Sequence, residues 1–150
     1  MKLLLGKELG RLARWLRILG FDAAYFAGDN LSSLLIQALR EERIILSRNH
    51  RLTSSSGVKV ILIKTGTLKD QIKEVMSKLE IKLDPGMMFR RCILCNARLV
   101  DIDKEKIRDR VPEYIFNTQQ DFISCPVCKR IYWQGSHWGN VKKILEEASC

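Results

Sequence analysis

Short apolar runs alternate with amphipathic segments along the first 84 residues of the chain. The apolar runs have the length of buried strands, and the segments between them repeat their apolar residues at helical spacing. The runs predict strands at residues 2–5, 22–26, 43–47 and 58–63. The amphipathic segments predict helices at residues 9–19, 31–42 and 68–79. Strands that alternate with helices of this length predict an α/β fold in which helices cover both faces of a parallel sheet.

The composition changes after Asp84-Pro85-Gly86, a sequence typical of a linker. All five cysteines and all three prolines of the chain lie beyond Asp84. We therefore expect two domains, which span residues 1–84 and 85–150. The second domain contains a polar excursion at residues 101–121. Its predicted elements are a short helix near residues 103–110, a strand at 130–133 and a last helix at 140–148.

The chain is basic, with 26 Lys and Arg residues against 17 Asp and Glu residues and a formal net charge of +9. An excess of this size favours a polyanionic partner such as RNA or DNA, although a charge that only maintains solubility is the alternative. No apolar run reaches the length of about 18 residues that a membrane span requires. The apolar start of the chain lacks a cleavage site, so we expect a cytoplasmic protein without a membrane partner.

Four of the five cysteines form two Cys-x-x-Cys knuckles, Cys92 with Cys95 and Cys125 with Cys128. In a reducing compartment, paired knuckles are typical of metal ligands and not of disulfides. Four thiolates suit a tetrahedral Zn²⁺ ion, and they leave no open position for a catalytic water, so the predicted role is structural. An iron–sulfur cluster uses the same ligands, and a redox-active cysteine pair is a further alternative.

Three arginines on the helix predicted at residues 9–19 are candidates for RNA binding. Arg11, Arg14 and Arg17 lie on the arc opposite the apolar residues, where three guanidinium groups can contact successive phosphates. A solvated helix face explains the same pattern. The other basic residues that we expect at RNA follow the third strand or flank the knuckles: Arg48, Arg90, Arg91, Lys129 and Arg130. The aromatic residues after the second knuckle either stack on bases or form a small core.

Several motifs point to one family of proteins. They are Leu9-Gly10-Arg11-Leu12-Ala13-Arg14-Trp15-Leu16-Arg17, Gly20-Phe21-Asp22, the two knuckles, Arg108-Asp109-Arg110-Val111-Pro112 and Tyr132-Trp133-Gln134-Gly135-Ser136-His137-Trp138. Together they resemble the Mut-seven C-terminal ribonuclease family over nearly the whole chain. The resemblance implies a PIN-like α/β nuclease domain fused to a zinc ribbon, and it implies metal-dependent cleavage of RNA.

Two acidic positions of that family are not acidic in this chain. The resemblance places Gly6 where the family has Asp after the first strand, and Asn49 where it has Asp after the third. Asp29 matches an acidic position. Nucleases of this type hold Mg²⁺ or Mn²⁺ with several carboxylates, so Asp29 and Asn49 are predicted as the remnant of a degenerate catalytic site. Because its two acidic partners are absent, capping of the helix that follows is the favoured role of Asp29.

We therefore predict an RNA-binding protein on a PIN-like scaffold, with structural zinc and with ribosomal RNA, tRNA or another structured RNA as its partner. Two alternatives stay open. The first is an active endoribonuclease that uses Mg²⁺ or Mn²⁺, and the second is a zinc-dependent adaptor between proteins. Steeply salt-sensitive RNA binding distinguishes the adaptor from the other two.

Overall fold

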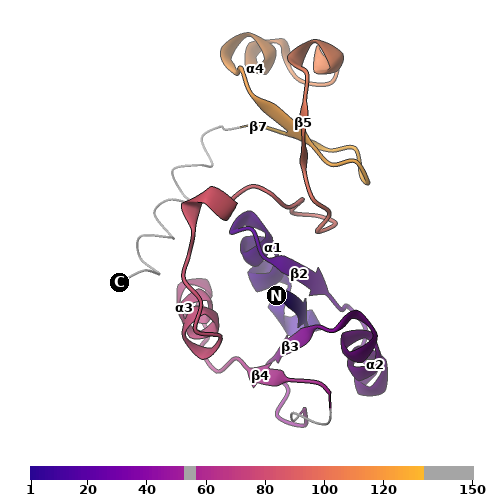
Figure 1. Ribbon diagram of the computed structural model, residues 1–150, viewed down its shortest axis with the longest axis vertical. Helices are drawn as coiled ribbons and strands as arrows, with labels where there is room; N and C mark the ends of the chain where they lie inside the picture. The colour runs from indigo at the N-terminus through magenta and orange to yellow at the C-terminus, as the bar shows by residue number, and fades with distance from the viewer. Residues whose placement is uncertain (53–56, 134–150) are drawn as a thin grey trace.

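Figure 1 shows the computed structural model, which describes residues 1–52 and 57–133. The last predicted helix, at residues 140–148, lies outside the described residues, as does the family tail motif beyond Trp133. The parallel sheet occupies one end of the long axis in Figure 1, and a small antiparallel sheet occupies the other. Among the described residues, no helix has the length and apolar character that a membrane crossing requires.

Four short strands form the parallel sheet, as the apolar runs predict. They are β1 (Lys2–Leu5), β2 (Asp22–Tyr25), β3 (Ile44–Ser47) and β4 (Val60–Leu62). The order in the sheet is β2-β1-β3-β4, so β1 and β3 are central while β2 and β4 form the edges. In this register Leu4 of β1 lies between Ala24 of β2 and Ile45 of β3.

Helices cover both faces of this sheet, which confirms the predicted fold class. They are α1 (Gly10–Ile18), α2 (Leu31–Glu41) and α3 (Leu68–Lys78). Side chains alternate between the faces along a strand. Leu3 and Leu5 therefore pack in the core beneath α1 and α3, whereas Leu4 packs in the core beneath α2. A strand with two buried faces requires a continuous apolar run, which is what the sequence has.

The cysteine-containing region forms an antiparallel sheet that the sequence only partly predicts. Its strands are β5 (Val100–Ile102), β6 (Phe122–Ser124) and β7 (Ile131–Trp133), in that order. The short helix expected near residues 103–110 forms only as the four-residue 3-10 helix η3 (Lys104–Ile107). The short helix α4 (Glu113–Thr118) follows Pro112, which disfavours helical backbone at the residue before it and so separates the two segments.

The chain passes from the first sheet to the second along the end of α1. The 3-10 turn η2 (Pro85–Met87) lies there, and the N–H of Phe89 donates to the carbonyl of Ile18. Gly20 has a φ of +98°, and a Cβ at this position would overlap the carbonyl of Met87. Glycine is therefore required at residue 20, where the linker approaches the backbone closely.

Candidate metal centre and nucleic-acid interface

The two Cys-x-x-Cys sequences form hairpin turns of the same geometry. In the first knuckle the N–H of Cys92 donates to the carbonyl of Ala97, and the N–H of Asn96 donates back to the carbonyl of Cys92. The second knuckle repeats both bonds around Cys125. The residue after the second cysteine has left-handed backbone in both turns, with φ of +68° at Asn96 and +66° at Lys129. This repeated turn directs both sulfurs of a knuckle to one point.

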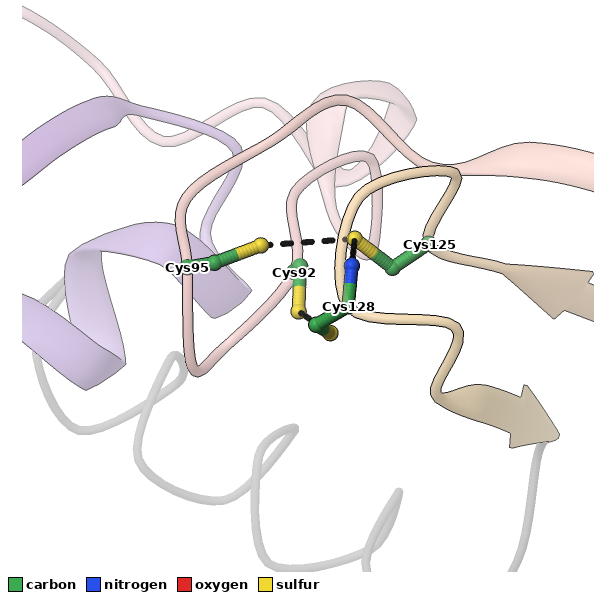
Figure 2. Close-up of side chains that lie close together, drawn as sticks. All are labelled: Cys92, Cys95, Cys125 and Cys128. Atoms are coloured by element: carbon green, nitrogen blue, oxygen red, sulfur yellow. Dashed lines mark hydrogen bonds between the residues drawn. The ribbon is translucent and has the colours of Figure 1, made fainter.

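The four sulfur atoms meet between the knuckles, and Figure 2 shows them converging from the two loops. All four lie within 4.8 Å of one another. The Sγ atoms are 3.5 Å apart for Cys92 and Cys128 and 3.3 Å apart for Cys95 and Cys125. Sulfurs at the usual zinc distance are about 3.8 Å apart in a tetrahedron. The cluster can therefore hold a metal ion such as zinc, and no other group of three such ligands forms within residues 1–52 and 57–133.

Hydrogen bonds favour the thiolate form of one ligand. Burial raises the pKa of the Cys92 thiol, but the Tyr132 hydroxyl and the N–H groups of Cys95 and Leu94 outweigh it and lower the pKa to about 6. The Tyr132 oxygen lies 3.0 Å from the Cys92 sulfur. A thiolate is the form that binds metal, so this hydrogen bond prepares the ligand. Tyr132 thus supports the cysteine cluster, while Trp133 packs edge-on against Phe122.

Arg17 attaches the first knuckle to α1. The prediction that its side chain is exposed on an RNA-binding face is therefore wrong. The side chain is only 7% exposed. Its Nε donates to the carbonyl of Ala23 at 2.8 Å, and one terminal nitrogen donates to the carbonyls of Ile93 and Leu94 at 2.7 and 3.1 Å. Burial lowers the pKa of Arg17, and the nearby knuckle thiols partly oppose this effect. The knuckle covers the helix face that periodicity alone assigns to solvent.

Asp22 completes the attachment between the knuckle and the edge strand β2. Its carboxylate accepts from Arg43 at 2.8 Å and from the side-chain amide of Asn96 at 2.6 Å. Burial raises the pKa of Asp22, but these two hydrogen bonds outweigh it and leave the pKa lowered. The amide oxygen of Asn96 accepts from the N–H of Ala23. Arg91 lies 3.7 Å from the same carboxylate and donates to the Asn96 carbonyl, so it also belongs to this junction.

A groove of about 940 Å³ runs between α1, β2 and the first knuckle. We call it the basic groove, because its lining includes four arginines: Arg11, Arg14, Arg17 and Arg43. Arg17 and Arg43 are engaged by carbonyls and carboxylates of the junction. Arg11 and Arg14 are exposed, and neither makes a hydrogen bond or an ion pair with any described residue. Two of the three arginines predicted on this helix therefore face a common groove.

The remaining predicted RNA-binding residues do not gather at one place. Arg48 follows β3, where its side chain donates to the carbonyl of Thr65. Arg90 precedes the first knuckle, and Lys129 and Arg130 follow the second; all three are exposed. The structure therefore places Arg48 beyond the end of β3 and the other three residues beside the knuckles.

The carboxyl ends of β1, β2 and β3 surround a small pocket of about 140 Å³, which we call the edge pocket. Gly6, Asp29 and Asn49 all line it, so the three positions that the family resemblance singles out are neighbours in space. Asp29 forms an ion pair with Lys7 and does not cap α2. The cap is Asn30, whose side chain accepts from the N–H of Ser33.

Glu8 also lines the edge pocket, a position that its place two residues after Gly6 does not predict. Its Oε2 atom lies 2.9 Å from the point where a Cβ on residue 6 would lie. A carboxylate thus stands beside the position of the absent Asp side chain. Asn49 is held in a local turn, since its side-chain oxygen accepts from the N–H of Arg51 at 2.9 Å. Asp22 and Asn96 are further residues that sequence reasoning missed, because their roles depend on a contact across 74 residues.

Comparison with known proteins adds one finding. The family model of the Mut7-C RNAse domain matches residues 1–145, which include both the parallel sheet and all four knuckle cysteines. No curated protein and no solved structure matches the chain.

Proposed function

The chain belongs to the Mut7-C RNAse domain family, and we propose that it is an RNA-binding protein on a ribonuclease scaffold with little hydrolytic activity of its own. One observation carries this proposal. The edge pocket sits where a parallel sheet of this kind places its active site, but two of the three expected acidic positions, Gly6 and Asn49, have no carboxylate.

The charge around the edge pocket explains why hydrolysis is expected to be weak. Glu8 and Asp29 each contribute one negative charge, but Lys7 pairs with Asp29 and neutralises one of them. Metal-assisted hydrolysis of RNA needs divalent cations held against the phosphate by several carboxylates. The amide of Asn49 is a neutral ligand, and glycine provides no ligand atom. The field at the pocket is therefore too weakly negative to hold the cations tightly.

The knuckle cysteines have a separate role in this proposal. Four protein ligands close the coordination shell of a zinc ion, so no position is left for a water nucleophile. The metal instead stabilises a small sheet whose own core is limited to residues such as Phe122 and Ile107. The net charge of +9 gives the whole molecule an attraction for RNA.

Restoring the missing carboxylates tests the proposal. We expect the natural protein to bind labelled RNA in a salt-sensitive way and to leave it uncut in Mg²⁺ or Mn²⁺. The variant Gly6→Asp with Asn49→Asp should gain metal-dependent cleavage. Gly6 has a φ of −66°, which any residue adopts, and only the flexible end of Glu8 must move. Asn49→Asp keeps the acceptor for the N–H of Arg51.

A matched control adds two negative charges at exposed positions of the excursion, Asn117→Asp with Gln120→Glu. It should bind and cleave as the natural protein does. Robust turnover by the natural protein that Asp29→Ala abolishes would overturn the proposal. RNA binding that is absent, or that does not weaken with salt, would favour the adaptor between proteins.

The position of Glu8 supports a second candidate function, an active metal-dependent ribonuclease. In this case Glu8 supplies the carboxylate that residue 6 lacks, because its Oε2 atom lies beside that position. Glu8→Gln would then abolish Mn²⁺-dependent cleavage, while Glu113→Gln, an exposed glutamate on α4, would leave it unchanged. The absence of any Mn²⁺-dependent cleavage by the natural protein eliminates this candidate.

A further inference from the structure

We propose that the basic groove binds single-stranded RNA and leads it toward the edge pocket, with the metal-loaded first knuckle as one wall of the binding site. The proposal rests on the RNA-binding function above and assigns that function to one surface. Its parts are two exposed arginines on α1, an aromatic ring at one end and the first knuckle at the other.

Arg11 and Arg14 provide the positive charge of the site. They lie three residues apart on α1, which corresponds to about 4.5 Å along the helix axis. Two guanidinium groups at this spacing can contact adjacent phosphates of one strand. Neither group has a partner among the described residues, so phosphate contacts replace water and not an existing ion pair. Arg17 and Arg43 add positive potential behind them while they remain bound to the protein.

Tyr25 provides an aromatic surface at the end of the groove nearest the edge pocket. The residue is 39% exposed, and its ring rests against Gly10 of α1. Its hydroxyl donates to the carbonyl of Lys7 at 2.7 Å, which fixes the ring. Unstacked bases bind to aromatic faces of this kind, whereas a duplex keeps its bases covered. Lys7 also lines the edge pocket, so a strand that passes Tyr25 reaches that pocket next.

The first knuckle closes the opposite end of the groove. Ile93, Leu94 and Asn96 line it, and Leu94 is 47% exposed, although it is apolar. An exposed leucine beside basic residues offers contact to a base or a ribose. The knuckle keeps this place through its bonds to Arg17 and Asp22. The groove therefore requires that the knuckle be folded, which ties RNA binding to the metal.

Fluorescence anisotropy with the full zinc-loaded chain tests the assignment. The probes are a labelled single strand of about 12 nucleotides and a duplex of equal length, titrated between about 50 and 200 mM salt. Arg11→Gln with Arg14→Gln should weaken binding of the single strand about 10- to 100-fold. The slope of log affinity against log salt should also fall by about 1.4, because two phosphate contacts are lost.

The matched control removes two exposed positive charges that do not line the groove, Arg40→Gln on α2 with Lys59→Gln before β4. It should keep the salt slope of the natural protein. Tyr25→Leu should weaken binding about 5- to 150-fold, the range measured for loss of one stacked base. Tyr25→Phe keeps the ring and should bind as the natural protein does. Unchanged melting temperature and zinc content in each variant separate a binding defect from a folding defect.

Three results would overturn the assignment. The first is that the natural protein binds RNA, while the groove variant and the control have equal affinity and equal salt slope. The proposed function then stands, and the RNA-binding site lies outside the basic groove. The second is tighter binding of the duplex than of the single strand. The third is no RNA binding by the natural protein at all, which would overturn the proposed function as well.

Discussion

Replacing Arg17 by methionine should weaken the attachment of the first knuckle to the α/β sheet. Methionine keeps most of the packing of the buried arginine stem, but it removes three hydrogen bonds to the carbonyls of Ala23, Ile93 and Leu94. A hydrogen bond that involves a charged group contributes about 1.5–3 kcal/mol to stability. Once the guanidinium is gone, water can reach the two knuckle carbonyls and partly replace the hydrogen bonds that they have lost. We expect a total cost of about 3 kcal/mol, near that of one to two such bonds.

The measurement is the melting temperature of the zinc-saturated protein. For a chain of this size, about 3 kcal/mol corresponds to a decrease of roughly 6–12 °C. Arg14→Met is the matched control, because it changes an exposed arginine on the same helix and should alter stability by less than about 0.5 kcal/mol. Arg17→Lys keeps the charge without the planar group that reaches several carbonyls, and it should behave like Arg17→Met. Equal melting temperatures for Arg17→Met and Arg14→Met would refute the attachment that we describe.

Three other predictions concern backbone conformation, pH and metal. Gly20→Ala should destabilise the protein by about 3 kcal/mol, because residue 20 has a positive φ and a Cβ would overlap the Met87 carbonyl. Gly66→Ala is the control, since Gly66 has open space around it, and this variant should have the melting temperature of the natural protein. Glu74 has a folded pKa of about 2, below its ordinary 4.5, because hydrogen bonds from Lys78 and from Thr65 outweigh the effect of burial. Its stabilising effect is therefore complete above about pH 5 and lost as the pH falls toward 2, and Glu74→Gln should flatten the acid limb of a stability–pH curve. Removal of zinc by a chelator should lower the melting temperature and make the four cysteines reactive to a thiol reagent; a melting temperature that is unchanged after complete removal would contradict a structural metal.

The parallel sheet could be predicted from the sequence because its physical signal is local. Strands with two buried faces need uninterrupted apolar residues, and β1 and β3 have them. The excursion between the knuckles lacks this signal. The strand β5 contains only Val-Asp-Ile and is largely exposed, and α4 has six residues without a buried side chain. Such elements form through pairing with β6 and through Pro112, and no periodicity within three to six residues reveals them.

Part of the candidate site could likewise be predicted from the sequence, and part of it could not. The knuckle cysteines were predictable, since their spacing within each turn is local and their chemistry is specific. Helical periodicity could not distinguish Arg14 from Arg17, because it reports only which face a helix turns to its own core. The residue that covers Arg17 is Ile93, which is 76 positions later in the chain. The place of Glu8 in the edge pocket depends on the 3-10 turn η1 (Lys7–Leu9), a conformation that the helical pattern does not specify.

The contacts of the first knuckle with β2 also bear on aggregation. An edge strand leaves backbone donors and acceptors free to pair with a strand of another chain. At Ala23 of β2, the N–H donates to the Asn96 side chain and the carbonyl accepts from Arg17, so both groups are occupied within the protein. Release of the knuckle frees this edge. If the cluster holds a metal, its loss should therefore convert a protected sheet into one that can add strands from neighbouring copies of the chain.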